Sequence, residues 1–324
     1  MRIMKLLTAF TFVMISNGIQ AQECISLSQN DVLSKNNVIV INSSGNYCIA
    51  DDIKLTERSY LNHGWRLSYD SPLVIATHAP DIQVDLSRRT LVATSTQAMR
   101  PGGIGIRKPN VLIKNGTLRV IGKQGVGVIH KPSGSSYITI PTDKKYLDYE
   151  TTREVDHPEG EDRTYLFGSQ KLPPKYQDAN ITIDNMNIFA TYRGVQLADN
   201  HNTIRNSTIE VDDNTAIYLM GQYPVIENNT IIIHSNKNGD TETQKKYNIQ
   251  IKDGAIKLRD AKGGIIRNNR IIYKGGLFGG KAPVAINLLD SKDVIIEGNS
   301  IEGFESLVRE NGDTSYSENN NTKK

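Results

Sequence analysis

The sequence predicts an all-β fold: a single-stranded parallel solenoid with an N-terminal cap and one long inserted arm. Three observations predict it. One short phrase recurs along the chain, a second alternating phrase precedes most copies, and no strand pair is joined by a two-residue hairpin signal. A period in the low twenties, with β-branched residues around a fixed Asn, is typical of solenoids.

The first phrase places an Asn between two short apolar runs. Its copies are 21 and 22 residues apart where they lie closest, and its clearest forms are Ile183-Asp-Asn-Met-Asn-Ile188, Ile204-Arg-Asn-Ser-Thr-Ile209, Ile226-Glu-Asn-Asn-Thr-Ile231 and Ile266-Arg-Asn-Asn-Arg-Ile271. An earlier copy begins at Ile113, and a later one, from Ile296, has Gly in the Asn position. We expect this Asn at an inward bend, where its amide can bond the Asn above and below.

The second phrase reads small residue, Val or Ile, any residue, Leu or Ile. It occurs as Gly194-Val-Gln-Leu197, Ala216-Ile-Tyr-Leu219, Ala255-Ile-Lys-Leu258 and Ala285-Ile-Asn-Leu288. Alternation of this kind indicates strands and not helices. Each strand should therefore pair in parallel with the next repeat, about 4.8 Å away, with its Ile and Leu inside.

The paired phrases resemble the right-handed parallel β-helix repeats of the pectate lyase-like superfamily, in the broad group that includes NosD-like proteins. The resemblance covers roughly residues 37–308. It implies a right-handed parallel β-helix. This scaffold carries lyases, hydrolases, epimerases and non-catalytic adhesins, so it does not by itself define a function.

The N-terminus is typical of a secretory signal over residues 1–21. Arg2 and Lys5 precede the apolar stretch Leu6 to Ile15, and Ala21 ends a plausible cleavage site. Without this segment the chain carries 36 basic and 35 acidic residues, which gives nucleic-acid binding no support. No segment is long and apolar enough to span a membrane. We expect an exported monomer, periplasmic or extracellular.

Residues 22–308 are expected to form one β-helix domain, with the N-terminal cap and first coils in 22–80. In an oxidising compartment Cys24 and Cys48 should form a disulfide, the alternative being two buried free thiols. Trp65 is interpreted as a cap or core anchor in preference to a sugar-stacking platform.

Three segments depart from the repeat. Residues 131–179 form an inserted arm rich in Tyr, charge and Pro, which we expect to be ordered along one face. Residues 234–247 form a shorter, more polar loop insertion. Residues 309–324 are so polar that we expect a disordered tail.

The variable position of the second phrase supplies an outward column on successive coils: Gln196, Tyr218, Lys257 and Asn287. Arg193 and Arg259 flank it. Uronate β-elimination requires a cation on the carboxylate, a base for the C5 proton and an acid for the leaving oxygen. The catalytic hypothesis takes Lys257 or Arg193 as base, Tyr218 as acid and Arg259 as carboxylate clamp, with Gln196 and Asn287 as substrate contacts. The alternative is an ordinary solvated surface.

No cofactor or metal site is predicted. Calcium, common in pectate lyase-like enzymes, would need a carboxylate cluster, whereas Asp199, Asp260 and Asp290 each follow a strand's Leu by two residues, as in a turn. The polygalacturonase motifs are absent. Asp156-His-Pro-Glu159 only permutes the Asp-Pro-His-Glu of mannuronan epimerases, although His157 could still reach substrate as a general base.

Two classes of function remain open. One is a lyase-like enzyme acting on an acidic polysaccharide, which should show polar residues converging under the arm with a perturbed titratable group. The other is a non-catalytic β-helix that binds glycans or surfaces, which should show a long open face with exposed aromatic residues and no buried charge.

Overall fold

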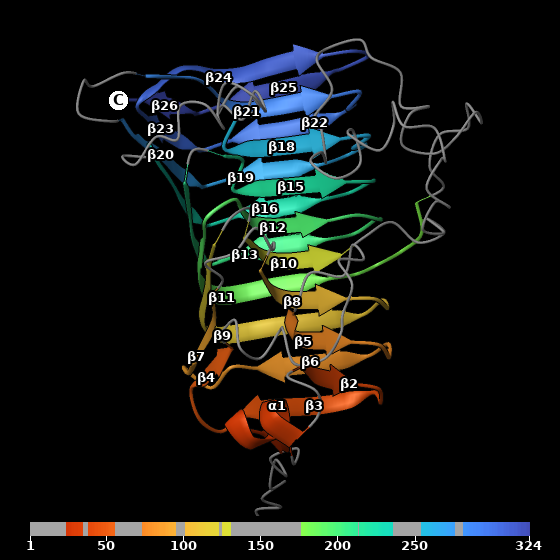
Figure 1. Cartoon of the computed structure of the whole chain (residues 1–324). Helices are drawn as coiled ribbons and strands as arrows, with labels where there is room; N and C mark the ends of the chain where they lie inside the picture. The colour runs from red at the N-terminus through yellow and green to blue at the C-terminus, as the bar shows by residue number, and fades with distance from the viewer. Residues whose placement is uncertain are drawn as a thin grey trace, which may run out of the picture.

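The structure, a computed structural model, is a stack of parallel coils that runs from α1 (Gln29–Ser34) at one end to β24 at the other (Figure 1). It describes residues 24–34, 38–55, 73–94, 101–122, 125–130, 176–212, 214–235, 254–275 and 281–324. The predicted signal (1–21), Trp65, nearly all of the predicted arm and most of the 234–247 insertion lie outside these residues. No helix in the described residues is long and apolar enough to cross a membrane.

One wall of the stack is a nine-stranded parallel sheet, which holds the strands of the second sequence phrase. Its strands, in order, are β2 (Ile39–Ile41), β5 (Leu73–Thr77), β8 (Gly102–Ile106), β10 (Val126–His130), β12 (Arg193–Leu197), β15 (Ile217–Met220), β18 (Ile256–Arg259), β21 (Ala282–Leu289) and β24 (Phe304–Asn311).

The remaining strands form a bent 17-stranded sheet, which holds the Asn phrase. They are β1 (Ile25–Leu27), β3 (Gly45–Ile49), β4 (Ile53–Leu55), β6 (Ile82–Asp85), β7 (Thr90–Thr94), β9 (Val111–Ile121), β11 (Thr182–Ala190), β13 (Thr203–Arg205), β14 (Thr208–Asp212), β16 (Val225–Glu227), β17 (Thr230–His234), β19 (Ile265–Arg267), β20 (Arg270–Lys274), β22 (Val294–Glu297), β23 (Ser300–Glu302), β25 (Tyr316–Asn319) and β26 (Thr322–Lys323).

The repeats stack in the register that the sequence predicted. Ile204 pairs with Ile226 and Ile226 with Ile266, while Leu219 pairs with Leu258 on the other wall. All of these side chains are buried in one continuous apolar core between the two sheets. A parallel β-helix is therefore the outcome, since each coil can bury its apolar face only against the coils beside it.

The fixed Asn of the first phrase does not point inward, so this part of the prediction is wrong by one residue, although Asn185 Nδ2 does donate to Oδ1 of Asn115 on the preceding coil at 2.9 Å. Asn185, Asn206, Asn228 and Asn268 have φ between 52° and 56° and are exposed. Their left-handed backbone turns the chain between two strands, a conformation that Asn tolerates better than most residues.

The inward ladder is built by the residue that follows. Asn229 donates to Asn269, Asn269 to Asn299 and Asn299 to Asn321, each Nδ2 to Oδ1 at 3.0 Å. The same Oδ1 atoms accept the backbone N–H of the preceding coil's Asn at 2.8–3.0 Å. The buried turn thus has its polar backbone groups paired.

The prediction of a disordered tail is also wrong. Residues 316–323 hold β25 and β26, which add a further coil, and Asn321 ends the interior ladder. Glu318 and Lys323 occupy the positions of Ile296 and Ile301, so apolar periodicity could not reveal this copy. Among the described residues this last coil has a neighbouring coil on one side only. Its other side is not covered by a further coil, and polar side chains suit such a surface because they can contact water.

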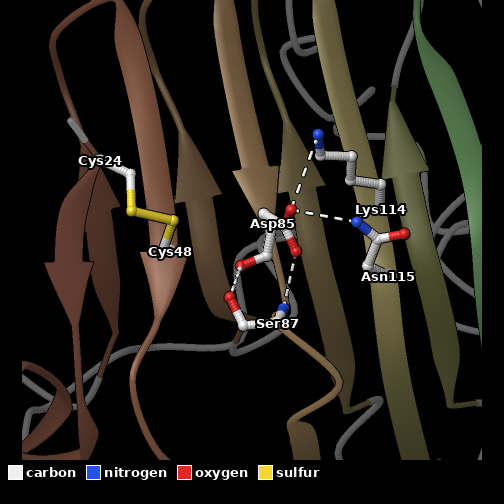
Figure 2. Close-up of a disulfide and its surroundings, with 6 residues drawn as sticks. All are labelled: Cys24, Cys48, Asp85, Ser87, Lys114 and Asn115. Atoms are coloured by element: carbon white, nitrogen blue, oxygen red, sulfur yellow. Dashed lines mark hydrogen bonds and ion pairs between the residues drawn. A yellow bond between two sulfur atoms is a disulfide. The ribbon is translucent and has the colours of Figure 1, made fainter. Parts of the chain in front are cut away.

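At the other end, α1 lies across the first coils, with Val32 buried in the core and Gln29 bonded to the backbone of Lys54 (Figure 1). The predicted disulfide is confirmed: Cys24 and Cys48 are joined, with Cα atoms 5.7 Å apart (Figure 2). It ties the residue before β1 to the neighbouring strand β3.

A column of alternating charge crosses the outer surface of the 17-stranded sheet. Seven residues on seven successive coils pair in register: Asp85, Lys114, Asp184, Arg205, Glu227, Arg267 and Glu297. Ion pairs join Lys114 to Asp85 at 3.6 Å (Figure 2) and Arg267 to Glu227 at 2.6 Å. We call this column the charge ladder. Its charges nearly cancel, so it offers a polyanion no net attraction.

Candidate functional site

The predicted outward column is a continuous line of polar side chains on the nine-stranded sheet. Gln196 pairs with Tyr218, Tyr218 with Lys257, and Lys257 with Asn287. The structure adds one position that the sequence analysis missed, because Asn287 pairs with Arg309 of β24. The residues on either side of Gln196, Tyr218, Lys257 and Asn287 are buried Ile, Val or Leu, which holds the polar side chain on the outer face. We call these four residues and Arg309 the polar column.

Tyr218 lies between two cations. The Arg193 guanidinium is 4.9 Å from the ring centroid of Tyr218, and the Lys257 ammonium is 5.5 Å from it. Arg193 also lies 4.9 Å from the ring of Tyr192 and donates to Gln196 Oε1 at 2.8 Å. The structure therefore brings together four residues of the catalytic and substrate-binding predictions. Stacking of this kind fixes the aromatic ring and the cations relative to one another.

A second group continues the cluster beyond the strand end. Arg259 lies beside Tyr218, its Nε is 3.9 Å from Asp260 Oδ2, and Tyr176 donates to the same Oδ2 at 2.8 Å. Burial acts to lower the pKa of Arg259, but the neighbouring Tyr218, Asp260 and Tyr176 outweigh it and raise that pKa. Burial, then the charge and hydrogen bond of Asp260, raises the pKa of Tyr176. At neutral pH Arg259 is thus a fixed cation and Tyr176 a fixed hydrogen-bond donor.

The column is not the solvated surface that the alternative interpretation expects. Arg193 is 1% exposed, Lys257 4%, Tyr218 5% and Asn287 1%. Solvent reaches the cluster at its margin, where Arg259, Asp260 and Arg309 are half-buried. A buried charge interacts more strongly than an exposed one because water screens it less.

The aspartates near the column serve as turn residues, as predicted. Asp199, Asp260 and Asp290 have φ of 70°, 56° and 47°. In the described part of the chain, no group of three or more His, Cys, Asp or Glu is placed to hold a metal ion. His157 and the Asp156-His-Pro-Glu159 stretch lie outside the described residues.

Sequence reasoning missed a buried His–Asp pair beside the column. His130, the last residue of β10, lies with Nε2 3.2 Å from Asp199 Oδ2 and Nδ1 2.9 Å from the carbonyl of Ile106. The other Asp199 oxygen accepts the backbone N–H of Gln177. The two partners are 69 residues apart, and only the coil register brings them together.

A match to a family model supports the fold. Residues 175–323 match the family described as right handed beta helix region. The crystal structure of the enzymatically active domain of bacteriophage CBA120 tailspike protein 2 aligns with 91% of this chain and 40% of that one, with a TM-score of 0.37 and 11% identity. No curated protein matches the sequence.

The parallel coils and the family match define the class of the protein. It is a right-handed β-helix repeat protein, as the sequence predicted.

Proposed function

We propose that this protein is exported and acts on an acidic polysaccharide at the polar column, by lyase-like β-elimination. The observation that carries the proposal is the position of Tyr218 between Arg193 and Lys257, with Arg259 beside it. Three cations around one phenol suit a polymer that carries carboxylates. The charge ladder on the other sheet has no such excess of positive charge.

The residues fit the three tasks of β-elimination. Arg259 would hold the C6 carboxylate and stabilise the charge that develops on it. Lys257, after losing its own proton to become a neutral amine, would take the C5 proton, the electron pair of that C–H bond would form the C4–C5 double bond, and the C4–O bond would break. Tyr218 would give its proton to the leaving glycosidic oxygen. Arg193 would position Gln196 and the Tyr218 ring.

Buried charge favours an enzyme over a simple binding face. A binding module is expected to show an open row of exposed aromatic residues, whereas Arg193 and Lys257 are buried and Tyr176 and Arg259 have perturbed pKa values. Perturbed groups converging at one place are typical of reactive sites. The disulfide is compatible with the export that residues 1–21 predict.

The test is a screen of purified mature protein against uronate polymers, with and without calcium. Product formation is measured by absorbance at about 235 nm, where the C4–C5 double bond conjugated to the carboxylate absorbs. Wild type should form product, and Lys257→Gln should lose it by at least about a hundredfold. Lys262→Gln, an exposed lysine on the turn after the same strand, is the matched control. If every polymer is bound but none gives unsaturated product or new reducing ends, the protein is a non-catalytic glycan binder.

A further inference from the structure

The charge ladder alternates in sign without interruption. Counted along the stack from Asp85, its first, third, fifth and seventh positions carry a carboxylate, and its second, fourth and sixth carry Lys or Arg. Asn319 of β25 takes the eighth position. None of the seven charged residues is buried, so all of them can meet a partner. Because neighbouring strands are about 4.8 Å apart, the eight positions extend over about 34 Å.

A second column lies beside the charge ladder, two residues earlier on each strand and therefore on the same outer face. From β9 to β22 its members pair in register as Leu112, Thr182, Thr203, Val225, Ile265 and Ile295. Four of the six are Leu, Val or Ile, and Ile295 is 42% exposed. We call it the apolar column. Exposed apolar side chains beside charges of both signs suit contact with another protein surface.

From this pattern we infer that the charge ladder and the apolar column form an interface with a second copy of the chain. The two copies pack face to face with opposite solenoid directions, about a two-fold axis that runs parallel to the strands between β13 and β16. This symmetry sets the first ladder position opposite the eighth and the second opposite the seventh. Across the interface each charge then faces an opposite charge, and each of the following pairings occurs twice: Lys114 with Glu297, Asp184 with Arg267, and Arg205 with Glu227.

The sign pattern selects this arrangement over its competitors. Copies with parallel solenoid directions would set each charge against its own counterpart, and a slip of one coil between antiparallel copies would also pair like charges. A slip of two coils keeps opposite charges together. In one direction, however, it moves Ile295 from Leu112 to the polar Asn46, and in the other it leaves fewer charge pairs. Because like charges held together repel, the ladder specifies both direction and register.

The ion pairs within each copy remain in this dimer. Arg267 donates from Nε and Nη2 to Glu227 Oε2 at 2.8 and 2.6 Å, and Arg205 donates in the same way to Asp184 Oδ2 at 3.0 and 2.9 Å. A guanidinium has further N–H donors, so each arginine can also bond a carboxylate of the second copy. Both arginine side chains are 43% exposed, which leaves them accessible. The charges of the two copies thus form a checkerboard.

The size of the face makes this a weak dimer. Two columns about 7 Å apart, with their side chains, cover a strip about 12 Å wide and about 34 Å long, roughly 400 Å² on each copy. Stable complexes bury about 800 Å² on each partner, so this interface belongs to the transient class. The inference goes beyond the monomer that the sequence analysis expects, and it does not depend on the proposed function.

The test measures self-association of the purified mature protein by sedimentation equilibrium at low salt. Wild type should dimerise with a dissociation constant of roughly 100 µM, which rises as salt screens the pairs. Glu297→Lys and Lys114→Glu each set like charges face to face, so each variant alone should associate at least about tenfold more weakly. An equimolar mixture of the two should regain the wild-type affinity, because the two altered residues then face each other and the two native residues do the same.

Ile295→Lys, which sets a charge against Leu112 of the second copy, should weaken the dimer by about tenfold. Ile121→Lys is the matched control, since Ile121 is 37% exposed at the end of β9 and lies outside both columns. It should leave the association unchanged. Should either charge reversal fail to fold, this second comparison decides alone. Wild type that stays monomeric at about 500 µM, or a mixture that associates no better than its components, would overturn the inference.

Discussion

The carboxylate of Asp199 lies 3.2 Å from Nε2 of His130, and both side chains are buried. Since Nδ1 of His130 faces the carbonyl of Ile106, both ring nitrogens meet acceptors. Because both side chains are buried, losing either contact leaves a buried polar atom without its partner. This pair joins the end of β10 to the turn after β12 and, through Gln177, to the chain that leads into β11.

Asp199→Asn should therefore destabilise the protein by about 3 kcal/mol, because it disrupts a buried pair of polar side chains. Asn keeps the left-handed backbone of this position, so the loss reports the side chain. Urea unfolding measures it. His234→Gln breaks a half-exposed pair with Glu210 and should cost less than about 1 kcal/mol. Equal losses of unfolding free energy in the two variants would show that the buried pair stabilises the protein no more than the half-exposed pair does.

Asn269→Ala should cost about 3 kcal/mol, since it removes the acceptor of Asn229 and the donor to the Ile226 carbonyl inside the core. The adjacent Asn268→Ala should cost only about 1 kcal/mol, because it loses a favoured left-handed turn residue and leaves the ladder intact. Chemical denaturation of both variants at one pH gives the comparison. A larger loss of unfolding free energy in Asn268→Ala than in Asn269→Ala would show that the fixed Asn, as the sequence analysis expected, contributes more to stability.

Reduction of the disulfide, or the double change Cys24→Ser and Cys48→Ser, should remove about 3 kcal/mol of stability on the chain-entropy account. In a stack where each coil touches only its neighbours, this loss should be local. Hydrogen exchange should rise in β1 and β3 while β14 to β22 stay protected. Uniform deprotection of all coils would contradict this expectation.

The stability contributed by Tyr176 should decline in alkali. Its pKa is raised in the folded protein, so the folded state holds the phenolic proton more tightly than the unfolded chain does. The contribution is complete below the unfolded value of about 10 and is lost as the pH rises above it. The difference in unfolding free energy between wild type and Tyr176→Phe should therefore stay constant from about pH 8 to about pH 10 and should shrink above about pH 10. Tyr223→Phe, at an exposed turn, should follow the wild type throughout.

Much of the fold could be predicted from the sequence, because period and alternation are local and repeat along the chain. The coil register and the column from Gln196 to Asn287 followed from them. The inward Asn could not be distinguished from its neighbour, since Asn228-Asn229 and Asn268-Asn269 carry the same residue at both positions. Position 268 takes the left-handed turn and position 269 the core.

The sequence predicted which residues form most of the candidate site, but it did not predict their burial or their contacts. The order of Gln196, Tyr218, Lys257 and Asn287 depends on register alone. Their burial, the contact of Arg259 with Tyr218 and the approach of Tyr176 depend on segments far away in the sequence. Arg309 was missed because its strand, β24, leads into polar residues that contain no apolar repeat.

The alternating charges of the charge ladder favour the addition or loss of an even number of coils. Solenoids change length by gaining or losing whole repeats, and a single additional coil between Arg205 and Glu227 would set two like charges side by side. Two additional coils would preserve the alternation at every step. Recombination and design should therefore tolerate coils added in pairs more readily than one at a time, even where the apolar core accepts either.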